Sequence, residues 1–246
     1  MTTLEHWPSP PARVEIASGE VHVWLASLDV PADKLSALRS LLNDDELSRA
    51  DRFLQPQHRV HSAAARGFLR TLLGHCLRVA PQSLEFQFNS FGKPSLAGAF
   101  ADADLRFNLS HSHGLALFAL ARGREIGVDI ERIRPTFAAE RIAERFFAPA
   151  ESARLRSLPN EQRPQAFFEC WTRKEAYVKA RGDGLSRRLD SFEVAFGPGM
   201  PPAILAAGDE ADAARWAVMD LQPPPGFVGA LVIARPLPLL RCWRLD

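Results

Sequence analysis

Residues 114–122 read GLALFALAR, and residues 227–235 read FVGALVIAR. Each is a short apolar stretch that ends in Ala-Arg, and short apolar runs of this kind are typical of buried strands. Their similarity predicts that the chain consists of two similar α+β halves that meet near residue 122. The alternative is a chance likeness between two buried strands.

The segments on both sides of residue 122 alternate between strand and helix patterns. Period-two alternation and β-branched residues predict strands at 21–28, 84–88, 106–110, 114–121, 125–131, 192–196, 215–221 and 226–234. Helical spacing of apolar residues predicts helices at 33–42, 63–79, 136–147, 151–157 and 165–180. We therefore expect an α+β fold with an N-terminal half at residues 1–122 and a C-terminal half at residues 123–246.

Composition excludes several classes of protein. The 246 residues include 30 Lys or Arg and 29 Asp or Glu, a net charge of +1, so a polycation that coats nucleic acid is not expected. The first 20 residues lack the basic flank and apolar run of a secretory signal, and no apolar run approaches the roughly 20 residues of a membrane span. Cys76, Cys170 and Cys242 lie far apart, which predicts reduced thiols in a cytoplasmic protein without membrane contact.

Two acidic residues lie in the predicted strand at residues 125–131. Side chains alternate along a strand, so Asp129 and Glu131 point to one face while Val128 and Ile130 pack on the other. Two carboxylates on one face repel each other unless a cation lies between them. Carboxylate oxygens are hard ligands that suit Mg²⁺ or Mn²⁺ better than zinc. The pattern indicates a divalent-metal site, with a solvated strand face as the alternative.

The predicted helix at residues 165–180 carries a second group of candidates. Trp171, Glu175 and Lys179 are spaced by four residues and share one face of the helix. Glu175 would add a third carboxylate to the acidic strand, and Lys179 would meet an anionic substrate held by the metal. The alternative is a surface Glu–Lys pair worth about 0.3–0.5 kcal/mol.

Basic residues gather in the first half. Residues 47–95 contain seven Lys or Arg and two acidic residues, a local charge of +5. Arg66 and Arg70 are four residues apart on a predicted helix, and a bound phosphate would relieve their repulsion. The segment indicates contacts with a phosphorylated ligand, with solvated surface as the alternative.

Hydroxyl and imidazole groups end the predicted strand at residues 106–110. His111 and His113 would share a face, but no further His or Cys stands at ligand spacing for zinc. Ser110 and His111 as hydrogen-bond donors to phosphate oxygens fit the basic surroundings better. The sequence has no G-x-S-x-G elbow, Walker loop or G-x-G-x-x-G motif, which disfavours hydrolases of the Ser-His-Asp type and the common nucleotide-binding folds.

Five motifs in order resemble the 4′-phosphopantetheinyl transferases, specifically the larger, monomeric type that activates peptide and polyketide synthetases. The resemblance spans at least residues 49–193. The motifs are Gly92-Lys93-Pro94, Phe107-Asn108-Leu109-Ser110-His111-Ser112, Ile126-Gly127-Val128-Asp129-Ile130-Glu131, Arg145-Phe146-Phe147 with Glu151, and Trp171-Thr172-Arg173-Lys174-Glu175-Ala176-Tyr177-Val178-Lys179 followed by Gly182-Asp183-Gly184-Leu185-Ser186.

The resemblance implies a pseudo-twofold pair of α+β halves with coenzyme A bound at their interface. It implies that Mg²⁺ is held by Asp129, Glu131 and Glu175 against the pyrophosphate, which Lys179 also contacts. It further implies that nucleotide phosphates are contacted by Lys93, Ser110 and His111. Arg49 matches a basic position near the 3′-phosphate. Glu46 stands where the family often has a second basic residue, so we expect Arg66 or Arg70 to replace it.

The implied reaction moves phosphopantetheine from coenzyme A to a serine of an apo acyl or peptidyl carrier protein and releases 3′,5′-ADP. Glu175 is the preferred base for the serine proton, with a metal-bound water as the alternative, and Glu151 is a further candidate participant. Two other functions stay open at this point. One is a Mg²⁺-dependent phosphodiester hydrolase acting on coenzyme A-like substrates, and the other is a non-catalytic module that binds carriers or coenzyme A. The natural carrier is not indicated.

Overall fold

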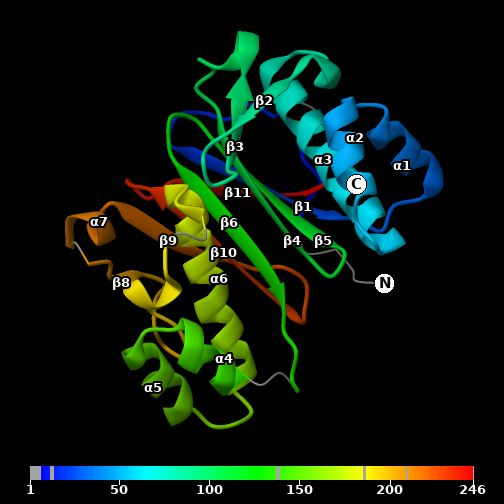
Figure 1. The fold of residues 1–246 in the computed structure, drawn as a ribbon. Coiled ribbons are helices and arrows are strands. Elements are labelled where there is room, and N and C mark those ends of the chain that lie inside the picture. Colours follow the sequence, from blue (N-terminus) through cyan, green and yellow to red (C-terminus); the bar gives the residue numbers. More distant parts are fainter. Residues whose placement is uncertain (1–6, 12–13, 137–138, 185–186, 209, 246) are drawn as a thin grey trace.

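The computed structural model describes residues 7–11, 14–136, 139–184, 187–208 and 210–245 (Figure 1). Its first sheet has the strand order β11-β1-β5-β4. The four strands are β1 (Glu20–Ser27), β4 (Arg106–Ser112), β5 (Leu115–Ala121) and β11 (Leu239–Leu245). Strand β5 is antiparallel to both β1 and β4. All seven of its residues are buried, which accounts for the unbroken apolar run in the sequence.

The second sheet has the order β6-β10-β9 and repeats the plan of the first. Its strands are β6 (Ile126–Arg132), β9 (Trp216–Leu221) and β10 (Phe227–Ala234). Strand β10 is antiparallel to both neighbours, as β5 is in the first sheet. The two similar segments of the sequence therefore form the equivalent strands β5 and β10. The α+β fold with two pseudo-twofold halves is confirmed.

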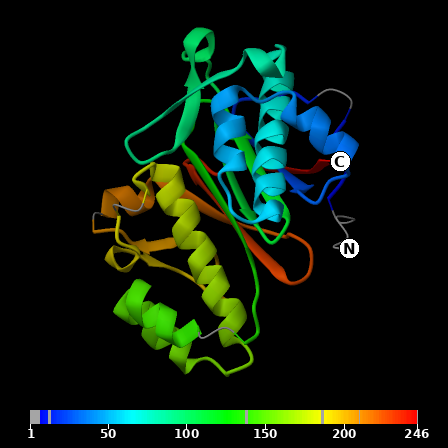
Figure 2. The same cartoon turned by 45° about the vertical axis from the view of Figure 1, so that its right-hand side comes forward.

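The helices also repeat along the chain. Three precede the hairpin of β2 (Glu85–Phe88) and β3 (Pro94–Ala97), and three precede the hairpin of β7 (Glu193–Val194) and β8 (Ile204–Ala206). The first three gather at one end of the molecule, whereas α4 and α5 lie at the other (Figure 2). The helices are α1 (Ala32–Arg39), α2 (Asp44–Asp51), α3 (Pro56–Leu77), α4 (Ala139–Phe146), α5 (Pro149–Ser157), α6 (Arg163–Arg181) and the short α7 (Glu210–Ala214).

Helix α6 begins and ends within two residues of its prediction, whereas α3 begins at Pro56, seven residues before the predicted start at residue 63. Helix α3 has a proline in its first turn, and α6 does as well. Helix α6 stops at Gly182, whose φ of 78° is in the left-handed region that a glycine adopts without strain. Among the described helices, none combines the length and apolarity that a membrane span requires. The three cysteines are free, as predicted.

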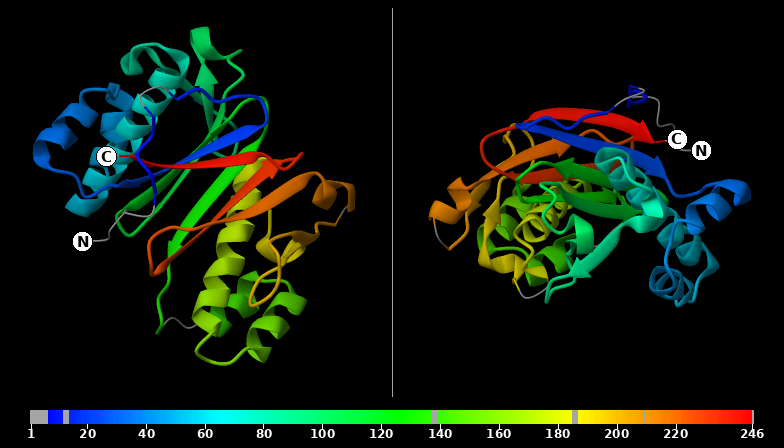
Figure 3. Two further views of the ribbon diagram at one scale, coloured as in Figure 1. Left: turned by 180° about the vertical axis from the view of Figure 1, so that it is seen from behind. Right: turned by 90° about the horizontal axis from the view of Figure 1, so that it is seen from above.

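The last strand returns to the first sheet. Strand β11 pairs in parallel with β1, and the two lie side by side in both views of Figure 3. Trp243 donates a hydrogen bond to His22 Nδ1 at 3.1 Å, which ties the two strands through their side chains. The sequence analysis did not predict β11, nor α2, α7, β3 and β8. The predicted strand at 192–196 is only two residues long. Within the predicted helix at 136–147, residues 137–138 lie outside the described part, as do Leu185 and Ser186 of the glycine-rich motif.

Candidate active site

The site lies where the edge strands of the two sheets face each other. Strand β4 ends the first sheet and β6 ends the second, and the two are in contact without forming one ladder. Side chains bridge them instead, because Val128 N–H donates to Asn108 Oδ1 at 2.9 Å and Ser110 Oγ donates to Asp129 Oδ1 at 2.7 Å. Ser112 Oγ donates to a carboxylate oxygen of the next acidic residue, Glu131, at 2.8 Å. We call these bridging residues of β4, Asn108, Ser110 and Ser112, the polar seam.

A glycine brings α6 directly onto β6. A Cβ atom at Gly127 would lie 2.1 Å from the carbonyl oxygen of Ala176 and 2.3 Å from the backbone nitrogen of Ala180. Any larger residue would push the helix away, so this glycine sets the depth at which α6 rests on the sheet. Glu175 and Lys179, each next to one of these alanines, are thereby held beside the acidic strand.

Lys179 reaches from α6 to the seam. Its ammonium group donates to Asp129 Oδ1 at 2.6 Å and to Ser110 Oγ at 2.9 Å. A serine hydroxyl has one hydrogen to donate, and Ser110 donates it in the hydrogen bond to Asp129. A phosphate that accepts a hydrogen bond from Ser110 therefore has to displace this contact. Asp129 is 4% exposed, and its other oxygen, Oδ2, is among the few buried side-chain atoms in the described residues that have no hydrogen-bond partner.

The other two carboxylates have raised pKa values. Burial raises the pKa of Glu131 above its ordinary value, and the charge of Asp129 raises it further. Burial likewise raises the pKa of Glu175, and both Asp129 and Glu131 add to the effect. Lys179 acts in the opposite direction on both groups but does not outweigh these causes. One buried carboxylate, Asp129, and two half-buried ones, Glu131 and Glu175, thus lie around Lys179.

This donor set fits a hard divalent cation. The candidate donors are carboxylate oxygens, and one of them, Asp129 Oδ2, is buried without a hydrogen-bond partner. A bound dication would relieve the repulsion among the carboxylates. As they stand, no three His, Cys, Asp or Glu side chains of the described residues converge closely enough to form a complete site. Lys179 occupies one oxygen of Asp129.

His111 lies between Ser110 and Ser112 on β4, so its side chain points to the opposite face of the strand, where it is exposed. Desolvation by the surrounding protein lowers its pKa, and the nearby charge of Lys179 lowers it further. His58 and His61, on α3, add smaller contributions of the same sign. The sequence analysis did not single out these two histidines, because nothing in the spacing along the chain connects them with β4.

Lys93 is at the interface but has partners from the chain. Its ammonium group donates to Glu125 at 2.8 Å and to the carbonyl oxygen of Ala180 at 2.9 Å. The β2–β3 turn that carries Lys93 is also held by Asn89, whose side chain donates to the carbonyl oxygen of Gly182 at 2.9 Å. The turn of the first half is therefore fastened to the end of α6 in the second.

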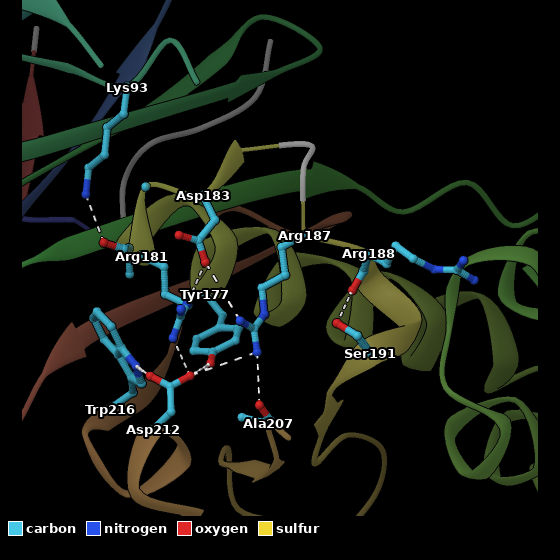
Figure 4. A network of polar contacts seen from close by, with 12 residues as sticks. Lys93, Tyr177, Arg181, Asp183, Arg187, Arg188, Ser191, Ala207, Asp212 and Trp216 are labelled. Atoms are coloured by element: carbon cyan, nitrogen blue, oxygen red, sulfur yellow. Dashed lines mark hydrogen bonds and ion pairs between the residues drawn. The ribbon is translucent and has the colours of Figure 1, made fainter. Parts of the chain in front are cut away.

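A network of charged residues supports that end of α6 (Figure 4). Asp212 accepts hydrogen bonds from Tyr177 and Arg181 and from the Trp216 indole, and Arg187 lies 3.9 Å away. Burial raises the pKa of Tyr177 to about 12, so its hydroxyl keeps its proton and acts as a donor here. Through Asp212, the network therefore joins Tyr177 and Arg181 of α6 to Arg187.

A cavity of about 690 Å³ opens between the β2–β3 turn and α6, so both halves supply its walls. Lys93, Glu175 and Lys179 line it together with apolar side chains such as Trp171. Arg145, Arg187 and Arg188 also line it, and the sequence analysis did not assign them. Arg187 and Arg188 directly follow the glycine-rich motif in the sequence, and this position could have indicated that they line the site.

Two of the predicted arginines are engaged elsewhere. Glu46 accepts a hydrogen bond from Arg66 at 2.5 Å and one from Arg70 at 2.7 Å. Arg70 is 1% exposed, and it also donates to two backbone carbonyl groups. The structure therefore does not favour Arg70 as a contact of the 3′-phosphate, because the guanidinium is enclosed and its donors are used. Arg66 is partly exposed but paired with Glu46, whereas Arg49 is exposed and lies 4.7 Å from the Phe88 ring.

Glu151, predicted as a further participant in the chemistry, has its partners within the second half. Glu151 is 3% exposed and forms an ion pair with Lys174 at 2.7 Å. It also accepts hydrogen bonds from the backbone of Ala148 and of Val194, so it joins the start of α5 to β7. Burial raises its pKa, but the group has no access to the cavity. Its role is to connect elements within the second half.

Comparison with known proteins places this geometry in a family. The family model described as 4′-phosphopantetheinyl transferase superfamily matches residues 125–232, and the model of the N-terminal part of 4′-phosphopantetheinyl transferases matches residues 30–122. The 4′-phosphopantetheinyl transferase HetI of Nostoc sp. is 44% identical over 94% of this chain and 95% of its own length. The chain belongs to the 4′-phosphopantetheinyl transferase superfamily. The family and the enzyme class predicted from the motifs are confirmed.

More distant relatives match over smaller parts of the chain. The 4′-phosphopantetheinyl transferase Sfp of Bacillus subtilis is 27% identical over 63% of this chain and 66% of its own. The solved structure of a holo-[acyl-carrier-protein] synthase from Thermotoga maritima has a TM-score of 0.37 and 22% identity, and covers 45% of this chain and 62% of that chain.

Proposed function

We propose that this enzyme transfers the 4′-phosphopantetheine group of coenzyme A to a serine hydroxyl of an apo acyl or peptidyl carrier protein in a Mg²⁺-dependent reaction that releases 3′,5′-ADP. The observation that carries the proposal is the group of three carboxylates around Lys179, of which Glu175 and Lys179 line the cavity between the halves. Phosphoryl transfer depends on positioning and charge neutralisation rather than on covalent catalysis. This site offers both.

Asp129, Glu131 and Glu175 would hold the Mg²⁺ ion, with Mn²⁺ as an alternative. When bound, the metal neutralises charge on the pyrophosphate of coenzyme A. Lys179 then provides the second positive charge of the site, since its ammonium group already lies between the seam and the cavity. It stabilises the charge that develops on the departing 3′,5′-ADP.

Glu175 is the base we assign to the serine proton. Burial and the neighbouring carboxylates raise the pKa of Glu175 in the metal-free site, but a bound dication would lower it, so the assignment depends on the position of Glu175. It lines the cavity through which a carrier serine would approach. Of the three carboxylates, it alone is supplied by the helix rather than by β6.

The two halves divide the work in this proposal. Residues 1–122 supply the contacts to the coenzyme A phosphates, with Lys93, Ser110 and His111 near the pyrophosphate and Arg49 at the 3′-phosphate. Residues 123–246 supply the metal site and the base. Because one chain provides both halves, the enzyme acts as a monomer.

Mass spectrometry of an apo carrier protein after incubation with the enzyme, coenzyme A and Mg²⁺ tests the proposal. We expect the phosphopantetheine adduct on the carrier serine and a matching amount of 3′,5′-ADP. Incubation without carrier is the control, because fast release of 3′,5′-ADP there would identify a hydrolase. Tight binding of coenzyme A with neither adduct nor release would identify a binding module.

A further inference from the structure

The two serines of the polar seam have different hydrogen-bond partners. Asn108, Ser110 and Ser112 alternate along β4, so all three point to the same side of the strand, toward β6. Ser110 is shared between Asp129 and Lys179 and lies where the proposed phosphates bind. The contact of Ser112 to an acidic residue is to Glu131 alone, at 2.8 Å.

The direction of the Ser112 hydrogen bond follows from its other neighbours. The backbone N–H of Arg132, which can only donate, points to Ser112 Oγ at 3.4 Å. His113 Nδ1 lies 3.0 Å from the same oxygen. An ionised Glu131 can only accept, so the single hydroxyl proton of Ser112 points to the carboxylate. Ser112 is 8% exposed, which keeps water from replacing it.

We propose that Ser112 is a positioning residue that orients the Glu131 carboxylate for the divalent metal. The inference rests on the proposed function, since it concerns the same metal. A free glutamate side chain rotates about several bonds, whereas the bond from Ser112 fixes one oxygen of Glu131 and leaves the other to the ion. Hydrogen-bond partners of ligating carboxylates act in this way, and their removal typically lowers metal affinity about 10–100-fold.

Binding of Mn²⁺ in the presence of coenzyme A, followed by the electron paramagnetic resonance of the free ion, tests the proposal on the full chain. We expect Ser112→Ala to weaken Mn²⁺ affinity about tenfold. Ser112→Thr, which keeps the hydroxyl, should restore it to within about twofold of the wild-type affinity. Ser83→Ala is the matched control, because Ser83 is an exposed serine far from the seam whose hydroxyl donates to a backbone carbonyl group.

Two further measurements separate positioning from general support of the fold. At saturating Mg²⁺ the KM for coenzyme A of Ser112→Ala should stay at the wild-type value, and its metal-free melting temperature should fall by no more than about 4 °C, the effect of losing one hydrogen bond. The Mg²⁺ concentration for half-maximal activity should rise. In a Glu131→Gln background, the effect of Ser112→Ala on Mn²⁺ affinity should fall below about twofold, since coupled residues are not additive.

Unchanged Mn²⁺ affinity in Ser112→Ala overturns the inference, and so does a tenfold loss that Ser112→Thr does not restore. If Ser112→Ala does not fold, Ser112→Cys takes its place, because a thiol fills the same volume but is a weak donor, and Mn²⁺ affinity equal to that of Ser112→Thr would overturn the inference. These outcomes are separate from the test of the overall function, which depends on the wild-type enzyme. If the wild-type enzyme modifies the carrier but Ser112→Ala binds Mn²⁺ normally, the proposed function stands and only this inference fails.

Discussion

Each half of the molecule buries acidic side chains, but their surroundings differ. Glu46 in the first half is 8% exposed, and burial alone would raise its pKa. The hydrogen bond from Arg70 and the charge of Arg66 outweigh burial and lower the pKa of Glu46. In the second half, Glu131 and Glu175 are also shielded from solvent, but there burial and mutual repulsion raise their pKa values.

The difference separates a structural cluster from a functional one. Glu46 has two cations for one carboxylate and caps α2 as well, so its hydrogen-bonding capacity is used within the chain. Asp129 and its two acidic neighbours share Lys179, and one oxygen of Asp129 has no partner. A cluster with more negative than positive side chains beside a cavity is arranged to bind a cationic ligand rather than to stabilise the fold. Four predictions test this contrast.

Glu175→Gln should have the largest effect, and on activity alone. Removing the base should lower the rate of phosphopantetheine transfer about 10²–10⁴-fold. The free energy of unfolding should stay equal or increase, because one of three repelling charges is gone. Single-turnover transfer to an apo carrier and urea unfolding of the same preparation measure the two quantities. Near-wild-type turnover would remove Glu175 from both the base and the ligand roles.

Glu46→Gln should show the opposite pattern. The change leaves Arg70 enclosed without its counter-charge, and breaking a buried pair in this way costs about 3–5 kcal/mol of unfolding free energy. With coenzyme A at saturation, the kcat of the folded protein should stay at the wild-type value. Urea unfolding and steady-state kinetics measure the two effects. Wild-type stability, or a fall in kcat that exceeds any change in KM, would place Glu46 among the functional residues.

Asp129→Ala should raise the requirement for Mg²⁺. The change removes an oxygen ligand and frees Lys179, so the Mg²⁺ concentration at half-maximal activity should increase at least about tenfold. Asp33→Ala is the matched control, since Asp33 is an exposed acidic residue in the first turn of α1. An unchanged Mg²⁺ titration for Asp129→Ala would exclude Asp129 from the metal site.

The pH dependence of stability should have opposite signs in the two clusters. Glu131 and Glu175 bind protons more tightly in the folded state, so their contribution increases as pH falls through their raised pKa values toward the unfolded value of 4.5. Glu46 has a lowered pKa, so its contribution is present above pH 4.5 and is lost as pH falls through the folded pKa.

Urea unfolding at a series of pH values, in metal-free buffer, measures both slopes. Glu175→Gln should flatten the rise on the side above pH 4.5, and Glu46→Gln should flatten the fall below it. The same pH profile in both variants would contradict the contrast between the clusters.

The parts of the fold that the sequence predicts are those with a strong local pattern. Strand β5 is buried along its whole length and β10 along its five central residues, so both read as apolar runs, and α6 has clear helical spacing. Helix α2 has the sequence DDELSRAD, in which apolar spacing is absent. It forms because Asn43 and Glu46 make a capping box and Glu46 is bound by arginines of α3. Those partners are distant in sequence.

The site divides in the same way. The spacing of Asp129 and Glu131 on a strand, and of Glu175 and Lys179 on a helix, follows from local geometry and was predicted. The approach of the helix to the strand depends on contact at Gly127, which no local pattern reveals. Conversely, local charge suggested Arg70 as a phosphate contact, but a count of charges does not show that this cation is already paired with Glu46.

The sequence by itself determined the family, the two-half plan and the chemical types of the site residues, because these depend on motifs and periodicities within short segments. The tertiary structure decided which charges are free. Glu46, Arg70 and Glu151 are ionisable and have motif or charge signals of their own, yet each is enclosed by partners from other elements. Ser112 shows the reverse, since an ordinary serine acquires a role through the carboxylate that a neighbouring sheet brings to it. Whether two charged side chains form an ion pair depends on the distance between them, and the folded chain sets that distance.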